Sequence, residues 1–110
     1  MKRYNFSHPI ESYSYSSPRV GNEEFAKYVA ASNIPAIRYT NNDDVVPHLP
    51  PRSLDYVHAG LEYHFAEGTT KQCSQDYDED PDCAIKYNSP LSFRMHYFPD
   101  GKLLPFPPYC

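Results

Sequence analysis

Residues that could do chemistry gather in a few places along this 110-residue chain. Two carboxylates, Asp43 and Asp44, open the stretch NNDDVVPHLPPR, in which three prolines stiffen the run behind the acids. This acid pair has two interpretations. It is either a polar turn leading into a proline-braced loop, or a place where one carboxylate is held still to accept a hydrogen bond. The other candidate groups are three cysteines and five histidines: Cys73, Cys83, Cys110, His8, His48, His58, His64 and His96.

A metal site is not predicted. The acidic run Asp76, Asp78, Asp80 and Asp82 resembles half of a calcium loop. However, Pro81 stands where such a loop needs glycine, and Tyr87 stands where it needs a bidentate glutamate. The five histidines show no metal-ligand spacing with cysteines or acids. We therefore expect no metal and no other cofactor, and a solvated loop at the acidic run.

Cys73 and Cys83 lie ten residues apart across a polar loop, and Cys110 is the last residue. The first two predict a disulfide, which would place the protein in an oxidising compartment, whereas a reduced pair fits a cytosolic chain. The odd count leaves one thiol free or paired with a partner outside this chain. No G-x-S-x-G sequence occurs, so the chain has no recognisable serine nucleophile.

Length and charge exclude several functional classes. The chain is long enough for one small domain. A net charge of -4 with scattered lysines and arginines gives little basis for nucleic-acid binding. No apolar run approaches the roughly 20 residues of a membrane span. The first residues lack the apolar region of a signal peptide, so none is predicted.

The elements that must position the acid pair form a predicted βαβ unit. Residues 10–16 alternate like a strand, and residues 23–32 predict a helix that Asn22 caps, with Phe25, Val29 and Tyr28 on its apolar face. Residues 36–40 predict a second strand, parallel to the first. Asp43 and Asp44 then follow the carboxyl end of a parallel strand, where ligands bind in open α/β sheets, which favours the functional interpretation.

The rest of the chain predicts fewer regular elements. Residues 54–65 resemble a hairpin arm or strand pair turning near Ala59 and Gly60, and residues 67–83 form an acidic polar loop. The tail from residue 85 is aromatic, proline-rich and irregular. One βαβ unit cannot cover both faces of a sheet, so we expect it to pair with more sheet or to belong to a larger domain.

The motifs SPRVGNEEFAKYV, NNDDVVPHLPP and HAGLEYHF, then the loop between Cys73 and Cys83 and an aromatic YF, occur in the order of the fungal class 3 lipases. The chain resembles the C-terminal part of that domain over residues 10–98, with residues 1–9 irregular and 1–110 forming one segment. The resemblance implies an α/β class and a partial α/β-hydrolase fold, with one βαβ unit, C-terminal strands and an irregular tail. It also implies a secreted, extracellular enzyme with a Ser-His-Asp triad that acts on lipid or aryl esters.

Carried over by motif, the triad acid falls on Asp44, with Asp43 as its solvated neighbour and Val46 near the acyl-binding pocket. The position expected for the triad histidine is occupied by Arg94, which cannot act as a base. His96 lies two residues later and, in extended backbone, would point to the same side. It is therefore the candidate base.

The resemblance also assigns Cys73 and Cys83 to a loop disulfide. It implies that Cys110 bonds to a missing N-terminal half, which would also carry the nucleophilic serine. The expected function is thus that of the C-terminal part of a triacylglycerol lipase or related ester hydrolase. The alternative is a non-catalytic binding protein derived from a lipase, which Arg94 and the absent signal peptide favour.

Overall fold

The computed structural model describes residues 7–74, 79–87 and 91–97. In chain order the elements are β1 (Ser12–Tyr15), α1 (Glu23–Ala31), β2 (Ala36–Asn41), the 3-10 turns Val46–His48 and Arg52–Leu54, β3 (Leu61–Ala66), β4 (Thr69–Gln72), the 3-10 turn Ala84–Lys86 and α2 (Arg94–Tyr97). The tail from residue 98, Cys110, Asp76, Asp78 and residues 1–6 lie outside the described residues. Within the described part, no helix has the length and apolar character needed to cross a bilayer.

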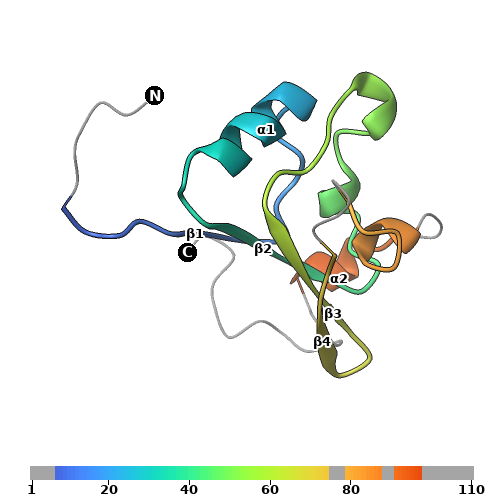
Figure 1. The fold of residues 1–110 in the computed structure, drawn as a ribbon. Coiled ribbons are helices and arrows are strands. Elements are labelled where there is room, and N and C mark those ends of the chain that lie inside the picture. The colour runs from blue at the N-terminus through green and yellow to red at the C-terminus, as the bar shows by residue number, and fades with distance from the viewer. Residues whose placement is uncertain (1–6, 75–78, 88–90, 98–110) are drawn as a thin grey trace.

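The predicted βαβ unit is confirmed. β1 pairs in parallel with β2, and α1 forms the crossover between them (Figure 1). Asn22 caps α1 as expected, because its side-chain oxygen accepts the N–H of Phe25 at 3.0 Å. Glu23 and Lys27 form an ion pair one helical turn apart, at 3.2 Å.

The sheet is larger than the sequence indicated, with the order β1-β2-β3-β4. β3 pairs in parallel with β2, and β4 returns antiparallel to β3. The predicted strand pair turning near Ala59 and Gly60 is wrong. The chain bends at Gly60, and β3 then begins as one arm of a hairpin at Leu61. The chain reverses instead at Glu67 and Gly68, both at positive φ (53° and 79°), so part of the predicted acidic loop is a strand.

The two faces of the sheet differ in character. Tyr15, Tyr39 and Tyr63 stand in register on neighbouring strands and stack with ring centroids 5.1 and 5.5 Å apart. The opposite face carries buried polar side chains from β2 and β3: Arg38, Thr40, Glu62 and His64. α1 lies over this side of the sheet, yet none of its residues is buried, and Phe25 and Tyr28 are 41% and 55% exposed.

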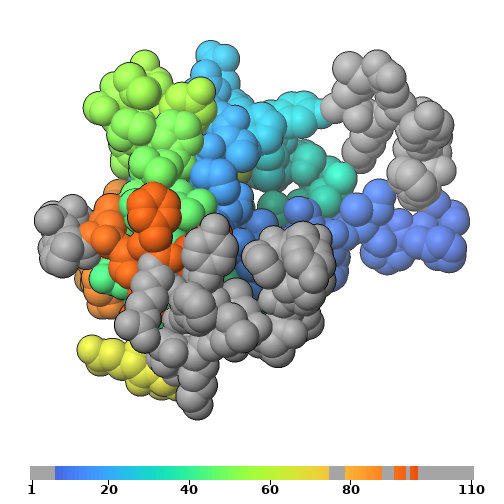
Figure 2. All heavy atoms as spheres, turned by 180° about the vertical axis from the view of Figure 1, so that it is seen from behind, coloured from blue at the N-terminus to red at the C-terminus, as the bar shows by residue number. Residues whose placement is uncertain are grey.

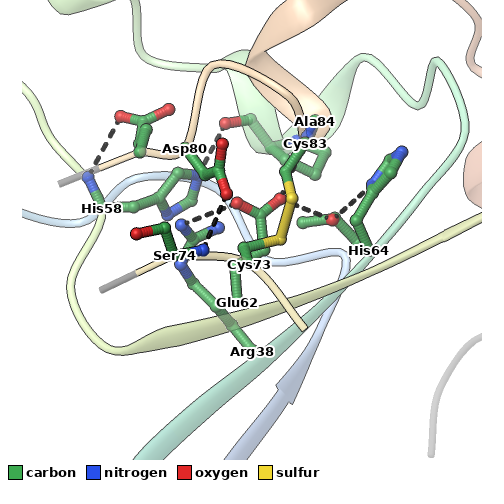
Figure 3. A network of polar contacts seen from close by, with 12 residues as sticks. Arg38, His58, Glu62, His64, Cys73, Ser74, Asp80, Cys83 and Ala84 are labelled. Carbon is green, nitrogen blue, oxygen red and sulfur yellow. Dashed lines mark hydrogen bonds and ion pairs between the residues drawn. A yellow bond between two sulfur atoms is a disulfide. The ribbon is translucent and has the colours of Figure 1, made fainter. Parts of the chain in front are cut away.

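Residues 73–74 and 79–87 lie against the polar face at β3 (Figure 3). Cys73 and Cys83 form the predicted disulfide, with an S–S distance of 2.05 Å. Glu62 accepts the N–H of Ala84 at 3.2 Å and the hydroxyl of Thr40 at 2.7 Å. Because that hydroxyl donates to Glu62, it accepts from Nδ1 of His64, 2.8 Å away. Burial of this imidazole lowers the pKa of His64.

Candidate active site

Asp44 is held at the carboxyl end of β2, and only 1% of the residue is exposed. Its backbone N–H donates to the carbonyl of Asn41 at 3.0 Å, which closes a tight turn directly after the strand. One carboxylate oxygen, Oδ1, accepts the backbone N–H of Val46 at 2.9 Å. The other oxygen, Oδ2, lies 3.1 Å from Nδ1 of His96. The carboxylate is thus fixed on one side and faces an imidazole on the other.

His96 reaches Asp44 from α2, so the structure brings together the two candidate triad residues, 52 positions apart in the chain. The extended backbone predicted at His96 is wrong. Residues 94–97 are helical, and the N–H of His96 donates to the carbonyl of Phe93 at 3.1 Å. The expected position, Arg94, begins the same short helix. A proton on Nδ1 directed at the carboxylate leaves the ring's lone pair on Nε2.

Backbone and amide contacts dock α2 against the end of β2, and sequence reasoning did not find them. Ser92 donates its N–H to the carbonyl of Asp43 at 2.8 Å and accepts the N–H of Val45 at 3.2 Å. The side-chain amide of Asn41 donates to the carbonyl of Met95 at 2.7 Å. Figure 2 shows the red-orange atoms of the segment that carries α2 against the green atoms of the segment that follows β2. The first Asn of NNDD was the available signal for this contact.

Two histidines brace the proline-rich loop behind Asp44. His48 donates from Nδ1 to the carbonyl of Asp44 itself, at 3.1 Å. His58 is buried and bonds through Nε2 to the carbonyl of Pro47 at 2.7 Å. Burial and the nearby Arg38 guanidinium lower the pKa of His58 from 6.5 to about 4, so it is neutral at physiological pH.

Among the described residues, Glu62, Cys73 and Cys83 lie close enough together to share a metal ion. The two sulfurs are bonded to each other, however, and cannot serve as thiolates. From the acidic run, the carboxylate of Asp80 accepts the N–H groups of Ser74 and Asp82 at 2.7 and 2.8 Å. These bonds lower the pKa of Asp80 and give this acid a role in forming a turn.

Two hollows of the described structure lie away from the Asp44–His96 pair. They are about 450 and 480 Å³ in volume, open beside α1 and are lined by Ala36, Ile37, Arg38 and His58 among others. Neither Asp44 nor His96 lines them. The chemistry of the acid–imidazole pair is therefore separate from these hollows.

Known proteins resemble both the sequence and this fold. The family model described as "Lipase (class 3)" matches residues 1–54. A lipase from Rhizomucor miehei is 41% identical over 92 residues, which cover 78% of this chain and 25% of that relative. The chain belongs to the fungal class 3 lipase family. A secreted mono- and diacylglycerol lipase from Fusarium solani is 46% identical over 55 residues, covering 50% of the chain and 16% of the relative.

A solved class 3 lipase structure extends the match to three dimensions. It is a triacylglycerol lipase whose catalytic centre is described as a serine protease triad, and it superposes with a TM-score of 0.73 at 38% identity. The superposition covers 84% of this chain and 35% of that structure. This chain therefore spans a quarter to about a third of the length of such class 3 lipases, as one part of an α/β-hydrolase fold.

Proposed function

We propose that this class 3 lipase chain supplies the acid and the base of a Ser-His-Asp triad that hydrolyses carboxylic esters, with acylglycerols as the substrate class. The observation that carries the proposal is the 3.1 Å contact between Oδ2 of the buried Asp44 and Nδ1 of His96. The names of the relatives, which describe lipases of mono-, di- and triacylglycerols, support the substrate class.

In this mechanism Asp44 holds His96 in the tautomer with its proton on Nδ1, so that Nε2 can accept a proton. The nucleophilic serine comes from a segment other than these 110 residues, which contain no G-x-S-x-G. His96 takes the hydroxyl proton as the serine oxygen attacks the ester carbonyl, and Asp44 stabilises the imidazolium that forms. The proton then passes to the departing alkoxide, and water hydrolyses the acyl-enzyme by the same steps in reverse order.

Val46 completes the proposed site, and Asp43 lies next to Asp44 in the chain. Val46 is half-buried beside the carboxylate and is proposed to contact the acyl chain. Asp43 takes no part in the proton transfer, although its carbonyl anchors Ser92. The relative described as secreted and the Cys73–Cys83 disulfide support an extracellular site of action, since disulfides persist in oxidising compartments. A bond from Cys110 to another segment of the domain is part of the same proposal.

The test is a chimera in which residues 10–97 of this chain replace the matching segment of the Rhizomucor miehei lipase. We expect the chimera to hydrolyse a short-chain nitrophenyl ester. Asp44→Asn should lower kcat by roughly 10⁴-fold, because the amide imposes the wrong tautomer on the histidine. His96→Gln should have a similar effect, and Asp43→Asn, next to the acid, should change kcat less than tenfold.

Unchanged turnover in both Asp44→Asn and His96→Gln would overturn the proposal. Should the chimera not fold, a second measurement uses the 110-residue chain alone. Here we expect no Asp44-dependent ester hydrolysis, because the serine is lacking, so turnover that disappears in Asp44→Asn would contradict the proposed division of the triad. A chimera that folds but stays inactive would favour the alternative, a non-catalytic binding protein derived from a lipase.

A further inference from the structure

A buried ion pair lies behind the loop that follows Asp44. One member, Arg19, belongs to the motif that begins at Ser17, and the proposed triad does not use the pair. Arg19 and Glu79 are 60 positions apart, and their side chains are 4% and 5% exposed. The guanidinium forms a two-pronged contact with the carboxylate, from Nε to Oε2 at 2.9 Å and from Nη2 to Oε1 at 2.7 Å. Such a planar fork fixes orientation as well as distance.

The third nitrogen of the Arg19 guanidinium, Nη1, is directed at the proline-rich loop. Nη1 donates to the carbonyl of His48 at 2.6 Å and to the carbonyl of Pro50 at 3.0 Å. The backbone N–H of Arg19 also donates to the carbonyl of Leu49, at 2.7 Å. One residue therefore contacts three consecutive carbonyls, directly behind the turn that presents Asp44.

Glu79 in turn ties Arg19 to other segments. Its Oε2 accepts the guanidinium of Arg52 at 2.9 Å and the backbone N–H of His58 at 3.3 Å. Burial alone would raise the pKa of Glu79, but the bonds to Arg19, together with the charges around it, outweigh burial and lower the pKa to about 2. The carboxylate is thus charged throughout the physiological range and keeps its partners.

The contacts continue from this pair to the acid. His58, held by Glu79, bonds to the carbonyl of Pro47 at 2.7 Å. His48, whose carbonyl Arg19 holds, bonds to the carbonyl of Asp44 at 3.1 Å. The backbone N–H of Val46, at the start of the same 3-10 turn, holds Oδ1 of Asp44. Displacing this loop would rotate the carboxylate relative to His96.

We propose that Arg19 and Glu79 are positioning residues that fix the loop 47–50 and thereby set the orientation of the Asp44 carboxylate toward His96. The catalytic meaning of this role rests on the proposed function, whereas the geometric role does not. Neither residue touches the reacting atoms in this scheme. Their effect passes through the loop backbone to Asp44.

The test uses the tautomer of His96 in the 110-residue chain, read from two-bond ¹H–¹⁵N correlations of the imidazole at mildly alkaline pH. We expect the unsubstituted chain to carry the proton on Nδ1. Asp44→Asn should move the proton to Nε2. The N–H of Val46 still binds the side-chain oxygen, so the amide NH₂ faces His96, and Nδ1 must accept a hydrogen bond instead of donating one. Arg19→Lys keeps the charge but cannot reach the carboxylate and two carbonyls together, so we expect the Nδ1–H signature to be lost to a mixture of tautomers.

The matched control is Arg52→Gln. Arg52 bonds to the same carboxylate oxygen as Arg19, but it is 44% exposed and no bond from its side chain to the loop carbonyls is described. We expect the His96 signature to be unchanged in this variant. Glu79→Gln should behave like Arg19→Lys, which provides a second variant if one of them does not fold. The dispersed amide spectrum of each variant reports whether the fold is retained.

The outcomes separate this inference from the proposed function. If folded Arg19→Lys and Glu79→Gln both keep the Nδ1–H signature that Asp44→Asn loses, the positioning role is wrong and the triad proposal stands. If the unsubstituted chain shows no Nδ1–H signature and Asp44→Asn changes nothing, the triad proposal fails. Loss of the Nδ1–H signature in Arg52→Gln to the same extent would also refute the positioning role. The loss of any bond to Glu79 would then change the tautomer, without a specific role for the bonds from Arg19 to the loop.

Discussion

Replacing Glu79 by Gln should remove one main source of the acid sensitivity of this fold between pH 4.5 and 2. The pKa of Glu79 falls from its ordinary 4.5 to about 2 in the folded chain, mainly through its bonds to Arg19. A tenfold difference in proton affinity corresponds to about 1.4 kcal/mol, so the ionised carboxylate contributes about 3 kcal/mol at neutral pH. Its side chain is 5% exposed, so solvent screens this contribution little.

The direction of the pH dependence of stability follows from the lowered pKa of Glu79. The unfolded chain binds the proton first as the pH falls, so this contribution is complete above pH 4.5 and is lost as the pH approaches 2. The contribution of His58 to stability is lost in a higher pH window, between 6.5 and about 4, because its pKa is lowered from 6.5 to about 4 in the folded chain. His58 is present in both proteins, but the Glu79 charge raises the pKa of His58, so the contribution of Glu79 itself is read from the window below pH 4.5.

The assay is urea unfolding of the two proteins at pH values from 7 to 2.5, with the disulfide intact. At pH 7 we expect Glu79→Gln to lower the free energy of unfolding by about 3 kcal/mol, because it also leaves Arg19 buried without its counter-charge. The deficit should shrink steadily below pH 4.5. Glu23→Gln is the control, since the Glu23–Lys27 pair is 64% and 74% exposed and such pairs contribute about 0–1 kcal/mol. Parallel pH profiles for Glu79→Gln and the unsubstituted chain would refute the reasoning.

Three further variants test the fold. Gly60→Ala should destabilise the chain by more than about 2 kcal/mol, because φ is +92° and a Cβ would lie 2.5 Å from the carbonyl oxygen of Ala36. Gly68→Ala, with φ of +79° and no atom within 4 Å, should cost only about 1 kcal/mol in the same thermal or urea unfolding measurement, and equal costs would contradict the clash. Replacing both Cys73 and Cys83 by Ser opens a loop with a sequence separation of 10 and should lower the free energy of unfolding by about 2–3 kcal/mol, whereas an unchanged urea midpoint would contradict this expectation.

Local sequence patterns were enough to predict the elements that present the acid. Asn22 marked the start of α1, and the apolar alternation marked β1 and β2, because capping and strand periodicity act over a few residues. The parallel pairing then placed Asp44 at the carboxyl edge of the sheet. The hairpin of β3 and β4 was missed because Glu67–Gly68 is a less usual turn pair than Asn-Gly or Asp-Gly.

The partners of the acid were harder to predict. The motif comparison pointed to position 94, and His96 was only a substitute, because a four-residue helix leaves no periodic pattern that fixes the direction of its side chains. The Arg19–Glu79 pair was missed for a different reason. Its members are 60 positions apart, and Glu79 stands in a run of acids in which no local feature separates it from its neighbours.

The kind of contact around Asp44 explains how His96, two residues past the position that the motif comparison indicated, can still meet the acid. Buried residues in the described part of the chain are mostly polar, and α1 buries none of its apolar side chains there. Apolar packing has no preferred direction, whereas hydrogen bonds and ion pairs fix angles as well as distances. Here Val46 and the loop contacts hold Asp44 independently of α2, and Asn41 and Ser92 hold α2 independently of the carboxylate. Because each half of the pair has its own anchors, an imidazole carried by α2 can meet a carboxylate whose orientation is already set.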